Sequence, residues 1–335
     1  MGRKIKHIIR SKEMLLILIL AIVVLVIRLI NQYFLSLGSL AGIMQAMSLT
    51  GIIAVGVGAL LIGGSIDLSA TQVYLFGGII CAMLIRSGIP WGFAMILAMA
   101  TGAVVGAINA FFISKLNMMP FIITIAMSNV ISGINLTLTD VQNLPVSVES
   151  FWWGGKMLFG AIPYPFIIMV ILMVGYGFLL KSTRFGRNVY LVGGNMAAAR
   201  LAGVNPVKIR TVLYINSSVL ASFAGIVLVS RMQTAIPSQN TDIHINAITA
   251  AVLGGIAFTG GAGGLAGCFI GVTLLSFFNA GLSSFALDAF WSLIASGVLL
   301  MIALAADYLN GRSREKMLGV KIRPISNEKR RMLDE

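Results

Sequence analysis

The run from Gly254 to Gly264 is rich in glycine, as are the loops that hold phosphate in nucleotide-binding proteins. Such a loop needs a lysine and a preceding strand to cradle phosphate groups, and this run has neither. The motif G-x-x-x-x-G-K-[ST] is also missing from the whole sequence. We therefore predict that the chain neither binds nor hydrolyses ATP by itself, and that these glycines serve close helix packing or a tight bend.

An acidic side chain inside a membrane is a candidate for a proton or ion path, and only Asp67 lies near such a position. A structural role is also open, because Ser69 and Gln72 have the spacing of a capping box and Asp67 could cap the same helix start. A proton-coupled carrier would need more buried acid than this sequence contains. Asp67 therefore remains a candidate for either role.

The cysteines and histidines give no sign of a metal or a disulfide. Cys81 and Cys268 lie far apart within apolar runs and form no C-x-x-C pair, and the histidines are His7 and His244 alone. We predict no metal site, no cofactor and no catalytic residue. A membrane-embedded transferase would need clustered acids or histidines, which this sequence lacks.

Uncharged polar residues within the apolar segments are the remaining candidates for contact with a solute. Amide and hydroxyl groups can donate and accept hydrogen bonds, so they could line a path for a hydroxylated solute or could join helices to one another. The full set is Gln45, Asn109, Thr124, Asn129, Asn135, Asn216 and Asn279. The candidate pathway residues are Gln45, Asp67, Thr124, Asn129 and Asn279.

The elements that position these residues must be membrane helices. The chain of 335 residues is 58% hydrophobic and only 10% charged, which is too little polar surface for a globular protein in water. We predict an all-α membrane protein of about ten spans, with eight as the alternative. The segments begin near Met14, Gly42, Gln72, Trp91, Phe121, Pro163, Thr211, Ile245, Gly264 and Asp288. Those starting at Gln72 and Ile245 are short for a full crossing, so they are expected to tilt, break or re-enter.

Charge predicts the orientation. Most Lys and Arg residues lie in the first thirteen residues, between Lys181 and Arg210, or beyond residue 312, and basic flanks stay in the cytoplasm. Both termini are therefore expected inside. The predicted organisation is a basic N-terminus (1–13), one transmembrane domain (14–307) with a cytoplasmic loop at 181–210, and a basic tail (308–335). The net charge of +13 is confined to membrane flanks, so we expect anionic lipid headgroups as partners and no nucleic acid.

The cytoplasmic loop contains a predicted short helix. Asn195 can cap its start, Ala197 to Ala202 can propagate it, and Gly203 can end it with Pro206 just beyond. From the residues alone, this segment is either a rigid contact surface offered to the cytoplasm or an ordinary solvated loop.

Several blocks between about Gly51 and Leu304 follow one another in a familiar order: Gly64–Ser69 (GSIDLS), Phe121–Thr124 (FIIT), Thr183–Arg187 (TRFGR), Gly193–Gly203 (GGNMAAARLAG), Ala247–Gly255 (AITAAVLGG) and Gly260–Gly264 (GGAGG). Together they resemble the permease subunits of bacterial ribose-type ABC importers. The chain departs from that pattern at His244–Asn246, where the family usually has E-L-D, and at Ser65, Ala70, Thr71 and Thr249. These departures leave the solute open, and so does the question of whether two identical chains pair.

The resemblance implies an inner-membrane permease that moves a monosaccharide or similar solute without covalent chemistry. It also implies a second permease chain, a cytoplasmic ATP-binding subunit and an extracytoplasmic solute-binding protein. The residues it assigns to ATPase coupling are Arg184, Gly186, Arg187, Asn195, Ala198, Ala199, Arg200 and Gly203. Ala198 and Ala199 are expected to enter a cleft of the ATPase, so that Ala199→Trp would fold but couple poorly. An ion-coupled secondary carrier is the alternative, which the scarcity of buried acid opposes.

Overall fold

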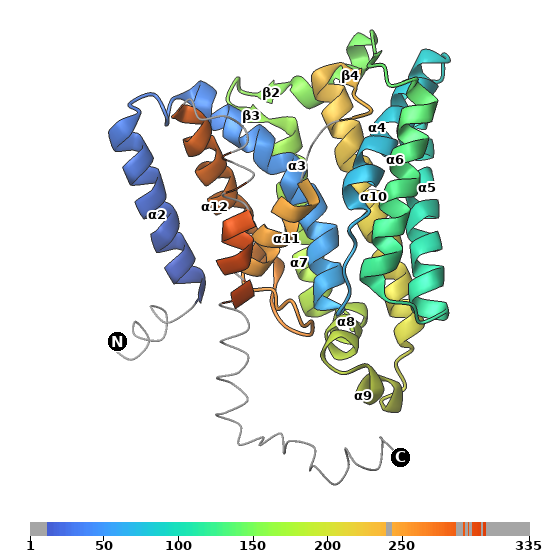
Figure 1. Cartoon of the computed structure of the whole chain (residues 1–335). Helices are drawn as coiled ribbons and strands as arrows, with labels where there is room; N and C mark the ends of the chain where they lie inside the picture. Colours follow the sequence, from blue (N-terminus) through green and yellow to red (C-terminus); the bar gives the residue numbers. More distant parts are fainter. Residues whose placement is uncertain are drawn as a thin grey trace, which may run out of the picture.

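The computed structural model describes residues 12–238 and 243–285, together with 291, 294, 297–302 and 304–305. Figure 1 shows a bundle of helices whose long axes run between two ends of the molecule. Within the described residues, six helices are long and apolar enough to cross a membrane. They are α3 (Leu37–Ile62), α5 (Trp91–Ala110) with its continuation η1 (Phe111–Lys115), α6 (Pro120–Thr139), α7 (Tyr164–Ser182), α10 (Pro206–Met232) and α12 (Leu265–Ser284).

Shorter elements complete the described chain. The apolar helices α2 (Lys12–Ile30), α4 (Ala70–Arg86) and α11 (Ile243–Leu253) join the bundle, while α8 (Arg184–Gly194) and α9 (Met196–Leu201) lie at one end of it. At the opposite end β1 (Leu144–Pro145) pairs with β4 (Thr234–Ala235), and η2 (Glu149–Gly155) precedes the pair β2 (Met157–Leu158) and β3 (Ile162–Pro163).

The prediction of an all-α membrane protein is confirmed. Within the described ranges each of the first nine predicted segments overlaps a helix, and the tenth, from Asp288, is helical at its described residues but lies in part outside them. The predicted N-terminal boundary at residue 13 falls inside α2, which begins at Lys12. The predicted tail, 308–335, lies outside the described residues.

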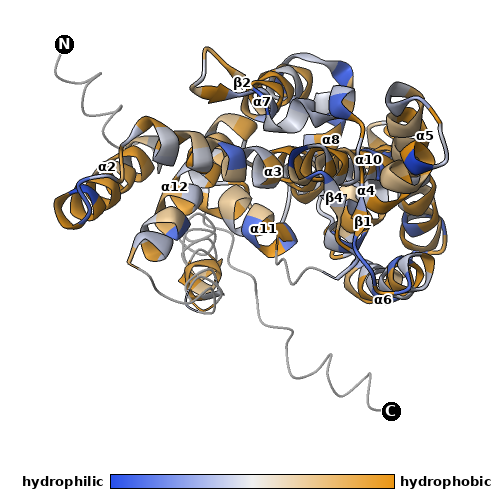
Figure 2. Ribbon diagram, turned by 90° about the horizontal axis from the view of Figure 1, so that it is seen from above, coloured by the Kyte–Doolittle hydropathy of each residue, from blue (hydrophilic) through white to orange (hydrophobic). Residues whose placement is uncertain are grey.

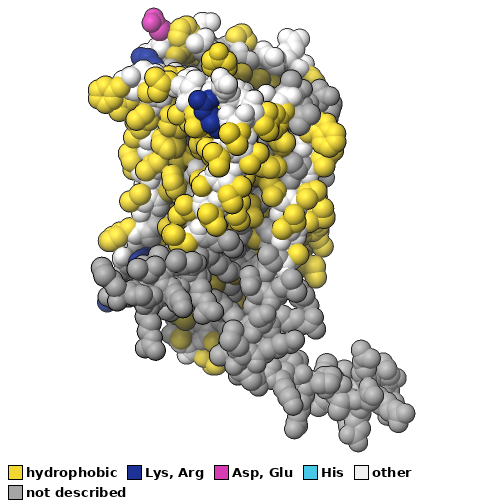
Figure 3. All heavy atoms as spheres, turned by 90° about the vertical axis from the view of Figure 1, so that its left-hand side faces the viewer, with side chains coloured by type: hydrophobic (Ala, Val, Ile, Leu, Met, Phe, Trp, Pro, Cys, Tyr) yellow, Lys and Arg dark blue, Asp and Glu magenta, His cyan; other side chains and the backbone are white. Residues whose placement is uncertain are grey.

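Helices α3 and α10 form the centre of the bundle, and the other helices surround them (Figure 2). The outer helices carry apolar side chains on their free faces: Ile122 on α6 is 58% exposed and Phe178 on α7 is 68% exposed. Figure 3 shows one side of the molecule covered by hydrophobic side chains between its ends. Such a surface matches the hydrocarbon of a bilayer, where apolar groups need no polar partner.

Small residues let α10 approach its neighbours closely. A Cβ atom added to Gly225 of α10 would lie 1.7 Å from the carbonyl oxygen of Tyr74 on α4, so only glycine fits at this crossing. Nearer the start of α10, a Cβ atom added to Gly106 of α5 would lie 2.7 Å from the carbonyl oxygen of Tyr214. This is the packing that holds helices together in lipid, where backbones must come close because no hydrophobic force drives them together.

Each half of the bundle contains a long helix, a non-helical stretch (a helix break) and a shorter helix in this order, and the two halves run in opposite directions. Helix α3 descends toward α8, residues 63–69 are non-helical, and α4 rises again; α10 rises, residues 233–238 are non-helical, and α11 descends (Figure 1). The two predicted segments that are short for a full crossing, which begin near Gln72 and Ile245, correspond to the short helices α4 and α11, and each of them follows a non-helical stretch rather than being broken itself. Non-helical backbone at membrane depth must be enclosed by protein, and Ser65, Asp67 and Ser69 are all buried.

Candidate functional site: the helix breaks and the α8–α9 corner

The corner between α7 and α8 is fixed by Thr183. Its hydroxyl donates to the carbonyl of Leu179 at 2.7 Å and accepts from the backbone N–H of Gly186 at 3.1 Å, so it ends α7 and caps α8. A Cβ atom on Gly186 would lie 2.0 Å from the carbonyl oxygen of Leu180, which only glycine avoids. Arg184 and Arg187 project from this corner with exposed side chains.

Helix α9 has the caps that the sequence predicts. The side-chain oxygen of Asn195 accepts from the backbone N–H of Ala198 at 3.0 Å. At the other end Gly203 has φ of +78°, and the N–H of Val204 donates to the carbonyl of Ala199. The sequence did not predict α8, which turns the solvated loop into two consecutive helices.

The surface of α9 differs from the expected one. Ala198 and Arg200 are exposed, but Ala199 is only 1% exposed and faces the body of the protein. Ala199→Trp would therefore overpack the interior at a cost of about 1–3 kcal/mol, contrary to the expectation that this variant folds normally. Leu201 is 92% exposed at the end of α9 and was not among the predicted contact residues.

Three glycine-containing segments meet where α8 touches the membrane bundle, and we call this contact the glycine junction (Gly64, Gly193, Gly260 and Gly261). A Cβ atom on Gly193 would lie 1.8 Å from the carbonyl oxygen of Ile62, and one on Gly260 would lie 2.7 Å from Cα of Gly64. The N–H of Gly261 donates to the same carbonyl of Ile62 at 2.8 Å. The glycine-rich run is thus a packed bend, as predicted, and it ties α8 to the end of α3 and to the loop between α11 and α12.

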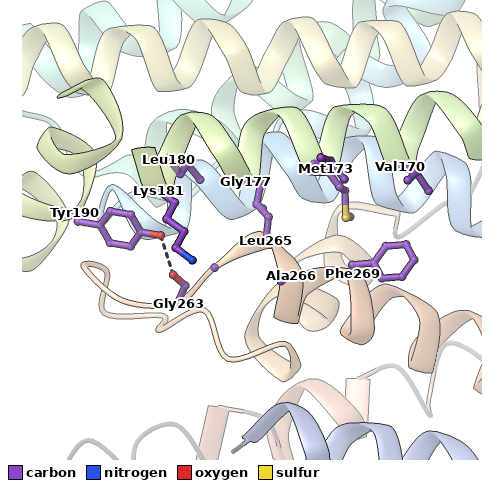
Figure 4. Close-up of a pocket in the computed structure, with 12 residues that line it drawn as sticks. Val170, Met173, Gly177, Leu180, Lys181, Tyr190, Gly263, Leu265, Ala266 and Phe269 are labelled. Atoms are coloured by element: carbon purple, nitrogen blue, oxygen red, sulfur yellow. Dashed lines mark hydrogen bonds between the residues drawn. The ribbon is translucent and has the colours of Figure 1, made fainter. Parts of the chain in front are cut away.

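Tyr190 adds a second tie between α8 and this loop. Its hydroxyl donates to the carbonyl of Gly263 at 2.8 Å, as Figure 4 shows. Burial raises the pKa of the Tyr190 phenol, so the hydroxyl keeps its proton and remains a donor at neutral pH.

Asp67 lies in the first break and holds the start of α4. It is fully buried, and its Oδ1 accepts from the backbone N–H of Ser69 at 2.9 Å and from the Ser69 hydroxyl at 2.5 Å. Asn109 of α5 donates to that hydroxyl oxygen at 3.0 Å, and Ser217 of α10 approaches Oδ2 at 3.4 Å. The capping box is wrong, because the Ser69 side chain makes no bond to the backbone of α4. The structural role of Asp67 is the one this geometry supports.

The N-terminal turns of α4 and α11 meet each other. The Thr71 hydroxyl lies 2.5 Å from Nδ1 of His244 and also accepts from the His244 backbone N–H at 3.3 Å. One residue further on, Gln72 receives hydrogen bonds from the side chain of Asn135 on α6 at its backbone and side-chain oxygens. Helix N-termini carry partial positive charge, so this meeting point favours polar or negatively charged groups. Thr71 and His244 both depart from the family pattern, which is a signal at each position, but no sequence signal predicts their contact.

The other candidate pathway residues are spread over the bundle. Thr124 is buried and its hydroxyl donates to the carbonyl of Pro120 in its own helix, while Asn129 is exposed on the same helix. Gln45 on α3 and Asn279 on α12 are half-buried. Among the described residues, no hydrogen bond joins any of these four to Asp67. The structure does not gather the five into one site.

Of the remaining polar residues, Asn109 and Asn135 join helices through the bonds described above. Asn216 on α10 does the same, since it accepts a hydrogen bond from the Tyr176 hydroxyl on α7. The two cysteines are buried and unpaired, and the described residues contain no cluster of three His, Cys, Asp or Glu side chains able to hold a metal.

Residues 39–304 match the protein family described as the permease component of the branched-chain amino acid transport system. The chain belongs to this family. It is 31% identical to the ribose import permease protein RbsC of Escherichia coli K12 over 86% of this chain and 91% of the relative. It is 33% identical to RbsC of Bacillus subtilis 168 over 86% and 90%. The L-arabinose ABC transporter permease protein AraH of Azospirillum brasilense is 30% identical over 85% and 84%.

A solved structure described as an inward-facing metal-chelate type ABC transporter has the same fold, with a TM-score of 0.51. It is 16% identical and covers 88% of this chain and 98% of its own. The chain is thus a multi-pass inner-membrane permease subunit of an ABC transporter, and not an enzyme. As in such transporters generally, an ATP-binding subunit and a solute-binding protein work with it. The alternative of an ion-coupled carrier gains no support.

Proposed function

We propose that this permease carries a monosaccharide or a related sugar-like solute into the cell by ATP-driven alternating access. The observation that carries the proposal is the agreement among its relatives: the permeases named for ribose and for L-arabinose each match more than four fifths of the chain. The family description names branched-chain amino acids instead. We favour a sugar because the relatives that match this chain over most of their length, at 30–33% identity, are named for sugars.

The meeting point of α4 and α11 is the proposed place where the solute passes. Gln72, His244 and Asn246 are half-buried there, in the first turns of the two helices. Amide and imidazole groups both donate and accept hydrogen bonds, which suits the hydroxyl groups of a sugar. A ligand shifts a two-state equilibrium only by its difference in affinity, so a weak site is enough for transport. This proposal replaces Gln45, Thr124, Asn129 and Asn279 as the leading candidates.

The exposed side of the α8–α9 corner is the proposed contact with the ATP-binding subunit. Arg184, Arg187, Ala198, Arg200 and Leu201 are exposed on it, and α8–α9 would lie in the cytoplasm by the positive charge of this segment. Movement of α8 would reach the end of α3 and the α11–α12 loop through the glycine junction, since these backbones touch without intervening side chains. A second permease chain, identical or different, would complete the pathway.

The test is uptake by proteoliposomes that contain this chain with its ATP-binding subunit and solute-binding protein. Labelled ribose and L-arabinose are offered, with leucine as the competitor that the family description names. We expect sugar uptake that needs ATP hydrolysis and is not reduced by leucine. Uptake by the chain alone under a pH gradient would instead support an ion-coupled carrier, and inhibition by leucine would move the substrate to amino acids.

A further inference from the structure

A groove between α7 and α12 lies apart from the helix breaks, and it adjoins the α8–α9 contact surface at Arg187. It has a volume of about 660 Å³, and Tyr190 of α8 and Gly263 of the glycine-rich loop line one end of it (Figure 4). Figure 4 shows the side chains of both helices directed into it. The wall is almost entirely apolar: Val170, Met173, Val174, Gly177, Leu265 and Phe269.

The length of the groove corresponds to one leaflet of a bilayer. From Val170 to Lys181 it follows α7 for eleven residue steps, or about 16 Å at the rise of an α-helix. The hydrocarbon core of a bilayer is about 30 Å thick, so the groove extends to about its middle. The free face of α7 beside the groove is apolar, with Ile171 65% and Val174 68% exposed, so the groove opens toward lipid.

Among the described residues that line the groove, positive charge stands only at the end where α8 lies. Lys181 lines the mouth, and an adjoining hollow is lined by Lys181, Arg187 and Tyr190. Figure 4 shows the Lys181 side chain beside the hydrogen bond between Tyr190 and Gly263. The sequence contains no Asp or Glu between Glu149 and Asp242, so no acid of this segment neutralises the two cations.

We propose that this groove binds one anionic phospholipid of the cytoplasmic leaflet. Its acyl chain lies between α7 and α12, and its phosphate lies beside Lys181 and Arg187. Apolar contact gives little preference over bulk lipid, so selectivity comes from the headgroup, and one cation near an anionic lipid surface favours binding about fivefold. Gly177 leaves space for the chain: a Cβ atom there would meet only Cβ of Leu265, at 4.0 Å.

The experiment is native mass spectrometry of the full-length chain released from detergent, titrated with phosphatidylglycerol or with phosphatidylcholine of the same acyl chains. Lys181→Ala removes the charge, and Gly177→Leu fills the groove. Lys208→Ala is the matched control for charge, because this exposed lysine lies at the same end and its backbone N–H keeps its bond to Asn205. Gly175→Leu is the matched control for volume, since a Cβ atom at Gly175 meets nothing within 4 Å.

We expect one tightly bound phosphatidylglycerol in the unaltered chain. Lys181→Ala should weaken phosphatidylglycerol binding about fivefold and leave phosphatidylcholine binding unchanged. Gly177→Leu should remove the bound lipid of either kind. Both control variants should bind phosphatidylglycerol as the unaltered chain does. Equal loss in Lys181→Ala and Lys208→Ala would show diffuse attraction to basic flanks and overturn the site. So would unchanged lipid binding in Gly177→Leu, and a change of oligomeric mass in that variant would assign the groove to a second copy of the chain.

Discussion

The hydroxyl of Thr71 lies 2.5 Å from Nδ1 of His244, and this contact joins the first turns of two short helices that are 173 positions apart in the chain. Because α4 runs toward one end of the molecule and α11 toward the other, their shared starting point lies between the two ends (Figure 1). A change in the angle of one helix therefore acts on the start of the other. This arrangement puts a polar contact at the point where we propose that the solute passes.

Thr71→Val tests that contact. Valine has nearly the same shape but leaves the ring nitrogen and the backbone N–H of His244 without this hydroxyl, which should cost about 1 kcal/mol of the free energy of unfolding. We expect a lower melting temperature in detergent and a changed KM for solute uptake. Thr137→Val is the control, because the exposed Thr137 hydroxyl bonds only to Gly133 in its own helix. Equal effects of the two substitutions would argue against a special role for the contact.

Leu201→Glu tests the contact with the ATP-binding subunit. Leu201 is 92% exposed, so the substitution should change the free energy of unfolding by no more than about 0.5 kcal/mol. It should nevertheless reduce co-purification of the ATPase and solute uptake. Phe159→Glu is the control, since Phe159 is 91% exposed at the opposite end. Ala199→Trp should instead lower membrane abundance by overpacking. A full complex with normal uptake in Leu201→Glu would remove α9 from the contact.

Gly193→Ala tests the glycine junction. The new Cβ atom would lie 1.8 Å from the carbonyl oxygen of Ile62, so α8 must move away at a cost of about 1–3 kcal/mol. Its neighbour Gly194 offers a matched control, because the nearest atom to a Cβ there is 3.9 Å away. We expect Gly193→Ala to lower ATP-dependent uptake and thermal stability, and Gly194→Ala to change neither. If both variants transport normally, the junction does not transmit movement.

Asp67→Asn separates a structural carboxylate from a proton path. Asparagine keeps an oxygen for the Ser69 N–H and hydroxyl, so it should cost less than Asp67→Ala, which leaves those donors unpaired at about 1–3 kcal/mol. We expect Asp67→Asn to retain most of the uptake, with no sensitivity to a protonophore beyond that of the unaltered protein. Complete loss of uptake in a stable, fully inserted Asp67→Asn variant would revive an ion-coupled mechanism.

Reporter fusions test the orientation. A reporter placed after Arg187, in α8, should behave as cytoplasmic, and one placed after Phe159, between β2 and β3, as extracytoplasmic. The two sites lie at opposite ends of the bundle (Figure 1). Both reporters on one side would contradict the bundle itself, and exchanged sides would invert the assignment of α8–α9 to the cytoplasm.

Much of the bundle could be predicted from the sequence because apolar runs and helix caps are local signals. Asn195 and Gly203 bound α9 as predicted, and the glycine-rich run forms a packed bend. Helix α8 was missed because Arg184 and Arg187 are typical of a solvated cytoplasmic flank, although Val189 and Val192 form a buried side. The Thr183 cap was the available signal.

The site itself could be predicted only in part, because its contacts join residues distant in the chain. Asn109 and Ser217 reach the Asp67–Ser69 turn from two other helices, and no local pattern reports such partners. The burial of Ala199 was unpredictable for another reason. Helix α9 has six residues, which is too short for hydrophobic periodicity to define its inner face.

The close fit of α4 against α10 has a consequence for how the protein is made. Helix α4 leaves the ribosome long before α10. Its face at Tyr74 and Gly78 is packed only after Gly225 of α10 has been synthesised and lies against it. The non-helical residues before α4 also depend on α10, since Ser65 bonds to Tyr214 and Ser217 approaches Asp67. During synthesis the first half must therefore remain in the membrane without the helix contacts that α10 supplies. A chain that stops before Pro206 would leave those contacts unmade and would be a natural substrate for membrane proteases.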